Sequence, residues 1–142
     1  MVKAVQAAKI MVFTGKRKTA IARATVVIPG KGRIYVNSVP LEIYPIELAR
    51  MKMYEPILVA GKDLINNMDI HVNVRGGGVM GQAEAVRVTI ARALAAVGGE
   101  EVRRKLLEYD RRMLICDPRR TEPKKYGGYS ARRKKQKSWD WI

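Results

Sequence analysis

Residues 69–99 read DIHVNVRGGGVMGQAEAVRVTIARALAAVGG, and this segment holds the clearest structural pattern in the chain. In residues 69–75 apolar residues alternate with polar ones, which predicts a strand with one buried face. Residues 82–97 place apolar side chains at helical spacing, which predicts an amphipathic helix that the following glycine pair ends.

Residues 100–110 begin with two acids and predict a second helix. A strand followed by helices that can cover one of its faces favours a two-layer α+β domain. Three charged residues lie away from the apolar side of the first helix: Glu84, Arg87 and Arg92.

The segments before residue 69 predict two more strands and a short helix. Residues 19–28 alternate along their length, and residues 33–37 alternate again after a Pro-Gly-Lys-Gly turn. We expect these two segments to pair as a hairpin. A helix is expected from residue 46, and Pro56 should end or kink it, with Gly61 as a later stop.

The composition indicates one compact and strongly basic domain. The chain has 142 residues, of which 47% are apolar, and a formal net charge of +15. This is enough apolar material for one core, and the charge indicates a polyanionic partner. The single cysteine excludes an internal disulfide. No apolar run is long enough to span a bilayer and the first residues lack a signal-peptide pattern, so we expect a cytoplasmic location.

More than half of the charge lies in the last 32 residues. Residues 111–142 contain eleven Lys and Arg against three Asp and Glu, a net charge of +8. Such a run is most often a solvated, disordered end. Here paired arginines are interleaved with tyrosines and tryptophans; guanidinium groups bind phosphates, and flat rings stack on unpaired bases. We therefore divide the chain into an N-terminal extension (1–12), a globular α+β domain (13–110) and an extended basic tail (111–142) that binds nucleic acid.

Motifs for catalysis are weak in this chain. Residues 76–81 satisfy G-x-G-x-x-G between a predicted strand and helix, where a dinucleotide-binding loop belongs. That fold needs a second parallel strand next, but a charged helix follows, and Gln82-Ala83 stand where a Walker motif needs Lys-Ser/Thr. The only histidine, His71, and the only cysteine, Cys116, have no catalytic or metal-ligating partners in the sequence. We expect no enzyme, cofactor or metal site; the alternatives are a nucleotide-dependent enzyme and a free RNA- or DNA-binding regulator.

Basic residues of the body stand at the ends of two predicted strands. Lys16-Arg17-Lys18 directly precede the segment 19–28, and Arg75 ends the segment 69–75 beside the glycine triplet. The triplet can be a solubilising flank, and Arg75 can be an exposed strand end. Because the tail is also basic, we favour contact with phosphates for the triplet, and a functional Arg75 would contact a phosphate or a base.

Five motifs resemble one family, small-subunit ribosomal protein nine (the S-nine family) in its archaeal form. They are GKRKTAIARA from Gly15, GKGRIYVN at 30–37, RGGGxxGQAxA at 75–85, IARAL at 90–94 and DxRRxEPKKYG at 117–127. The resemblance implies a two-layer α+β sandwich, in which a small mixed sheet has helices on one face, similar to the second domain of ribosomal protein S-five. It also implies a left-handed β-α-β crossover, although right-handed crossovers are the rule.

The resemblance further implies a structural constituent of the small ribosomal subunit that supports translation. Such a protein binds ribosomal RNA (rRNA) in the head of the subunit, beside other head proteins, and sends its tail toward the peptidyl-site tRNA; no membrane is involved. By position, the implied rRNA contacts are basic residues of body and tail: Lys16, Arg17, Lys18, Arg75, Arg111, Arg112, Arg119, Arg120, Lys124, Lys125, Arg132 and Arg133. The implied tRNA-proximal residues are Lys134, Lys135, Lys137 and Trp139.

The end of the chain departs from the family pattern. Family chains usually close on Gln-x-Ser-x-Arg, whereas here Asp140 stands where the arginine is expected and two more residues follow. A carboxylate cannot replace a guanidinium against phosphate. Either neighbouring lysines supply that contact or the tryptophans contribute by stacking.

Overall fold

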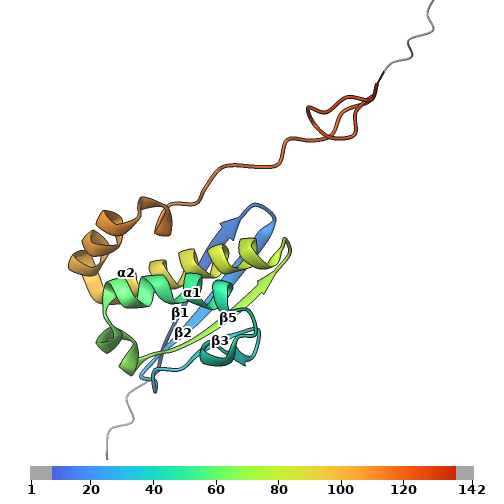
Figure 1. Ribbon diagram of the computed structural model, residues 1–142. Coiled ribbons are helices and arrows are strands. Elements are labelled where there is room, and N and C mark those ends of the chain that lie inside the picture. The colour runs from blue at the N-terminus through green and yellow to red at the C-terminus, as the bar shows by residue number, and fades with distance from the viewer. Residues whose placement is uncertain (1–7, 137–142) are drawn as a thin grey trace, which may run out of the picture.

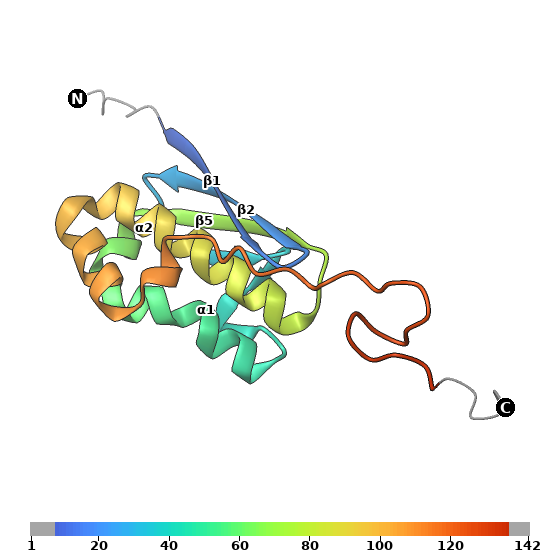
Figure 2. The ribbon, with the colours of Figure 1, turned by 90° about the horizontal axis from the view of Figure 1, so that it is seen from above.

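The computed structural model describes residues 8–136, which form a two-layer α+β domain with an extended C-terminal tail (Figure 1). One layer is a five-stranded sheet with the strand order β1-β2-β5-β3-β4. Two helices cover one face of this sheet (Figure 2). The strands are β1 (Lys9–Arg17), β2 (Ala20–Ile28), β3 (Ile34–Val36), β4 (Val39–Pro40) and β5 (Asp69–Arg75). The helices are α1 (Glu47–Ala60) and α2 (Val79–Tyr109), with short 3-10 helices at Leu41–Ile43 (η1), Lys62–Asn67 (η2) and Arg111–Met113 (η3). The predicted α+β class is confirmed.

Alternation along the central strands defines the buried face of the sheet. Fully or almost fully buried side chains on this face are Ala20, Ala22, Ala24, Val26, Ile70, Val72 and Val74. The alanines of β2 leave room for α2 to lie close against the sheet. The edge strand β1 contacts the same helix at Gly15. Only glycine fits there, because a Cβ would lie 2.6 Å from the carbonyl oxygen of Ala85. Helix α2 is therefore seated against both β1 and β2.

The segment 69–99 folds largely as its pattern predicts. Strand β5 has the predicted bounds, and α2 begins three residues earlier than expected. The helical geometry of α2 is interrupted at Gly99 (φ 79°, ψ −164°), so the predicted break between two helical segments is confirmed. Helix α1 continues through Pro56 to Ala60 and its C-cap is Gly61, so Pro56 does not end the helix and the predicted stop at Gly61 is confirmed. Pro56 is buried, and its packing offsets the hydrogen bond that a proline removes.

The predicted hairpin between residues 19–28 and 33–37 is wrong. Strand β2 pairs antiparallel with β1 and β5, whereas β3 pairs parallel with β5 and antiparallel with β4. Strand β1 includes the last four residues of the segment 1–12 that we set apart as an extension. The residues of β1 that face the core are Met11, Phe13, Gly15 and Arg17. Because the last two are not apolar, the sequence of β1 lacks the alternation that predicts a strand.

The parallel pairing of β3 with β5 creates a β-α-β unit around α1. The chain passes from β3 through β4, η1, α1 and η2 to β5, which lies beside β3 in the sheet. The expected left-handed crossover refers to this unit, and its handedness stays a prediction. Among residues 8–136, no helix has the length and apolar character needed to cross a membrane.

Candidate nucleic-acid interface

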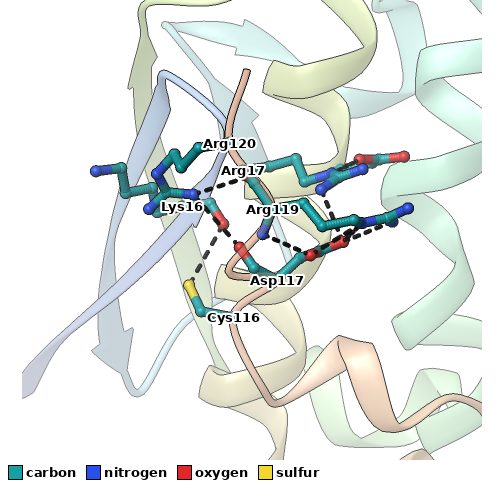
Figure 3. A network of polar contacts seen from close by, with 7 residues as sticks. Lys16, Arg17, Cys116, Asp117, Arg119 and Arg120 are labelled. Atoms are coloured by element: carbon teal, nitrogen blue, oxygen red, sulfur yellow. Dashed lines mark hydrogen bonds and ion pairs between the residues drawn. The ribbon is translucent and has the colours of Figure 1, made fainter. Parts of the chain in front are cut away.

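The first tail residues are fixed to the body between β1 and α2, and we call residues 113–119 the tail anchor. Arg92 of α2 donates hydrogen bonds to both neighbouring segments: to the carbonyl oxygen of Thr14 in β1 at 2.7 Å, and to that of Leu114 in the tail at 3.2 Å. The Cys116 thiol lies 3.4 Å from another β1 carbonyl oxygen, that of Lys16 (Figure 3). These contacts set the point at which the tail leaves the body.

Asp117 is the centre of the tail anchor. Its carboxylate accepts hydrogen bonds from the guanidinium groups of Arg17 and Arg119, each at 2.7 Å, and from the backbone N–H of Arg119 at 3.0 Å (Figure 3). Arg17 also pairs with Glu84, so one network joins β1, α2 and the tail. The hydrogen bonds from Arg119, together with the charge of Arg17, hold the pKa of Asp117 far below its usual range. The network therefore stabilises the charged form of this carboxylate.

A second ion-pair cluster lies behind the tail anchor. Arg87 of α2 pairs with Glu55 of α1 at 2.7 Å and with Asp110, the residue before η3, at 2.9 Å. Burial acts to raise the pKa of Asp110, but the backbone N–H of Arg112 and the Arg87 guanidinium outweigh it and lower that pKa. Arg87 thus connects the two helices with the start of the tail.

The structure separates the predicted RNA contacts into paired and unpaired cations. Four of them form ion pairs with carboxylates: Arg17, Arg119, Lys125 and Arg132. Within residues 8–136, the others make no ion pair: Lys16, Lys18, Arg75, Arg111, Arg112, Arg120, Lys124, Arg133, Lys134 and Lys135. Lys137 and Trp139 lie outside the described residues. Unpaired cations keep their full charge for a ligand, whereas paired ones must first exchange a carboxylate for a phosphate.

Part of the unpaired charge lies on the face of the sheet that the helices leave open. Lys16, Arg23 and Arg75 alternate with the buried residues of their strands and point to this face. Arg23 and Arg75 line a hollow of about 430 Å³ together with Ile21, Asn37 and Asn73. Arg75 is one of the predicted contacts, whereas Arg23 is not, because Arg23 belongs to this group only once β2 and β5 are in register.

The distal part of the described tail folds back on itself, and we call residues 122–135 the tail loop. Glu122 pairs with Lys125 at 2.6 Å and with Arg132 at 2.9 Å. The backbone N–H of Lys135 donates to the carbonyl oxygen of Gly127 at 3.1 Å. Hydrogen bonds from Lys125 and Arg132 lower the pKa of Glu122. A single carboxylate thus pairs with two of the six Lys and Arg of the loop, which backbone hydrogen bonds also close.

The glycine-rich segment 76–81 has a structural explanation. A Cβ on Gly76 would lie 2.7 Å from the carbonyl oxygen of Thr19, and both Gly76 and Gly77 have positive φ. The segment therefore turns tightly against the connection between β1 and β2. In the described chain α2 leads into η3 and the tail rather than into a parallel strand, so the neighbour that a dinucleotide site uses is missing. Among the described residues, no cluster of His, Cys, Asp and Glu could hold a metal ion.

The fold and the charged site define a class of protein: a small basic α+β domain with a cationic C-terminal arm anchored across it. The family model described as ribosomal protein S9/S16 matches residues 15–139. Small ribosomal subunit protein uS9 of Aeropyrum pernix is 53% identical over 147 residues, covering 92% of this chain and 97% of that protein. The uS9 proteins of Desulfurococcus amylolyticus and Sulfurisphaera tokodaii are 58% and 47% identical, covering 92% and 94% of this chain and 93% and 98% of theirs. The chain therefore belongs to the ribosomal protein S9 family.

Family membership confirms several of the predictions made from the sequence. The resemblance to the S-nine family in archaeal form is correct, and the chain is a structural protein of the small ribosomal subunit rather than an enzyme. Its location in the cytoplasmic ribosome follows from the same relatives. The nucleotide-dependent enzyme considered above is thereby excluded.

Proposed function

We propose that this protein binds rRNA in the head of the small ribosomal subunit and extends its tail toward the tRNA in the peptidyl site. One observation carries the proposal: the described part of the tail, residues 111–136 with a net charge of +8, is fixed at one end to a folded body and then runs away from it (Figures 1 and 2). An arm that only raised solubility would not need a fixed exit point.

The division of charge supports a different role for each region. The unpaired cations of the body, Lys16, Lys18 and Arg75, lie on or beside the open face of the sheet and would contact rRNA there. The paired Arg17 and Arg119 would hold the start of the tail through Asp117. The distal lysines would then reach furthest from the body.

The physical basis of binding is the release of counterions from RNA. Each phosphate neutralised by Lys or Arg releases condensed cations, so log affinity should fall with log salt by about 0.7–0.9 per contact. The tail anchor lowers the conformational entropy that the tail must lose on binding, because one end is already positioned. Both effects favour an arm that is strongly charged and fixed at its base.

Salt-dependent RNA binding by matched charge variants tests this proposal. Substituting Arg120→Gln together with Lys124→Gln, two unpaired residues among the implied rRNA contacts, should reduce the slope for a head-domain rRNA transcript by about 1.4–1.8. The control is Arg103→Gln with Arg104→Gln, which removes the same charge from the exposed part of α2. Equal changes in slope for the two pairs would contradict a specific role of the tail. A second variant, Lys134→Gln with Lys135→Gln, tests the tRNA contact: loss of tRNA protection in reconstituted subunits, with rRNA binding retained, would support it.

A further inference from the structure

The tail loop contains two tyrosines in different environments. The Tyr129 ring already has cationic neighbours, with the Arg133 guanidinium 5.9 Å and the Lys135 ammonium 5.6 Å from its centroid. Tyr126 is more exposed: its relative exposure is 108%, compared with 62% for Tyr129. One ring is thus used within the loop, and the other is completely open to solvent.

An open hollow adjoins the exposed ring. It has a volume of about 370 Å³ and is lined by Lys124, Lys125, Tyr126, Gly127, Gly128 and Lys135. The two glycines place no side chain in this space, and Gly127 has φ 80°, a conformation that suits glycine. The lining therefore combines a flat aromatic ring, bare backbone and several ammonium groups.

These groups match the chemistry of an unpaired nucleotide. A base has a flat π face that stacks on an aromatic ring, and its phosphates attract ammonium groups. Lys125 is held by Glu122 at 2.6 Å, whereas Lys124 makes no ion pair within the described chain and Lys135 faces the ring of Tyr129. Lys124 and Lys135 can therefore approach phosphates on the two sides of a stacked base.

We propose that Tyr126 stacks on an unpaired base of RNA at the tail loop, with Lys124 and Lys135 holding the adjacent phosphates. This inference rests on the proposed function, since it names a nucleotide-binding site within the RNA-binding tail. The nucleotide can belong to rRNA or to tRNA, because the two share the same chemistry. Glu122 positions the loop by pairing with Lys125 and Arg132.

Binding of short single-stranded RNA by the full-length protein tests the site. The probe is a fluorescently labelled oligouridylate, compared with the same strand carrying a central abasic nucleotide. Tyr126→Ala should weaken binding of the intact strand by about 10-fold or more, and Tyr126→Trp should restore it. The same Tyr126→Ala substitution should leave binding of the abasic strand unchanged, because the base is the missing partner. Tyr129→Ala is the matched control and should have a much smaller effect.

Each outcome decides between distinct explanations. If the protein binds RNA with a steep salt dependence but Tyr126→Ala and Tyr129→Ala behave alike, the stacking site is wrong and the proposed function stands. If the wild-type protein binds no RNA, or binds without salt dependence, the proposed function itself fails. Because Tyr126 is fully exposed, its substitution should not change the urea unfolding midpoint. Chemical footprinting on reconstituted subunits and on an isolated anticodon stem-loop then shows whether rRNA or tRNA supplies the base.

Discussion

The tail anchor and the tail loop differ in their ratio of acidic to basic residues. In the tail anchor, Asp117 accepts from Arg17 and Arg119, and Glu84 completes the network, so two carboxylates match two guanidinium groups. In the tail loop, Glu122 is the only acid among six Lys and Arg. Where acids match the bases, the charges stabilise the fold. Where they do not, the excess positive charge is available to an RNA ligand.

This comparison explains why charge alone is a poor guide to the proposed RNA interface. Arg17 stands in a basic triplet, yet its side chain is only 14% exposed and both of its partners are carboxylates of this chain. The neighbouring Lys16 and Lys18 make no ion pair among the described residues. Partners that are distant in the sequence therefore decide what each basic residue does.

The largest loss of stability is expected when the close contact between β1 and α2 is disrupted. Substituting Gly15→Val would force a side chain against the backbone of α2, because even a Cβ would lie 2.6 Å from the Ala85 carbonyl oxygen. We expect the free energy of unfolding to fall by about 3 kcal/mol or more, measured by urea unfolding. Gly78→Ala is the control, since a Cβ there meets nothing within 4 Å. Equal losses for the two variants would contradict the close seating of β1 on α2.

A smaller loss is expected when the second ion-pair cluster is removed. Arg87→Ala leaves Glu55 and Asp110 without their shared partner. The expected loss is about 1–2 kcal/mol, below that of a fully buried pair, because water screens the partly exposed carboxylates. Arg103→Ala on the exposed part of α2 should change the free energy of unfolding by less than about 0.5 kcal/mol. Similar losses of unfolding free energy for Arg87→Ala and Arg103→Ala would show that the ion-pair cluster does not stabilise the fold.

The sequence predicts the elements of this fold better than it predicts their pairing. Strand β5 and the break at Gly99 follow from local patterns, which need no knowledge of distant residues. The partner of β3 does not, because a parallel strand brought by a crossover and a hairpin strand show the same alternation. Strand β1 escaped detection because its core face ends in Gly15 and Arg17, which pack against α2 and the tail anchor rather than against apolar side chains.

The candidate site was predictable in its charge but not in its internal contacts. The excess of Lys and Arg in the tail is a property of composition and needs no structure. The role of Asp117 depends on a contact with Arg17 that spans 100 residues. A signal was present on α2, where Glu84, Arg87 and Arg92 lie away from its apolar side and all three turn out to bind the tail or its neighbours. Spacing on the helix indicates a polar contact surface but does not identify the segment that covers it.

A loss of stability smaller than that of Arg87→Ala is expected when Asp110 and Asp117 are protonated. The pKa values of Asp110 and Asp117 are lowered in the folded protein, so each contributes stability that is present above the unfolded carboxyl pKa, about 3.9. That stability should be lost progressively as the pH falls below about 4. Urea unfolding midpoints should therefore drop more steeply for the wild type than for an Asp110→Asn, Asp117→Asn variant. Parallel pH profiles would contradict the ionic role of these two residues.

The smallest effect on stability is expected at an unpaired arginine, which we compare with a paired one. Arg75→Gln removes a cation from the open face of the sheet, so the salt slope of rRNA binding should fall by about 0.7–0.9 with no change in the unfolding midpoint. Arg17→Gln should do the reverse, lowering the unfolding midpoint because Glu84 and Asp117 lose their partner, with little change in slope. If Arg17→Gln instead reduced the slope as Arg75→Gln does, phosphate would be displacing Asp117 in the complex. The tail anchor would then open when RNA binds, and the division between folding charges and binding charges would hold only for the free protein.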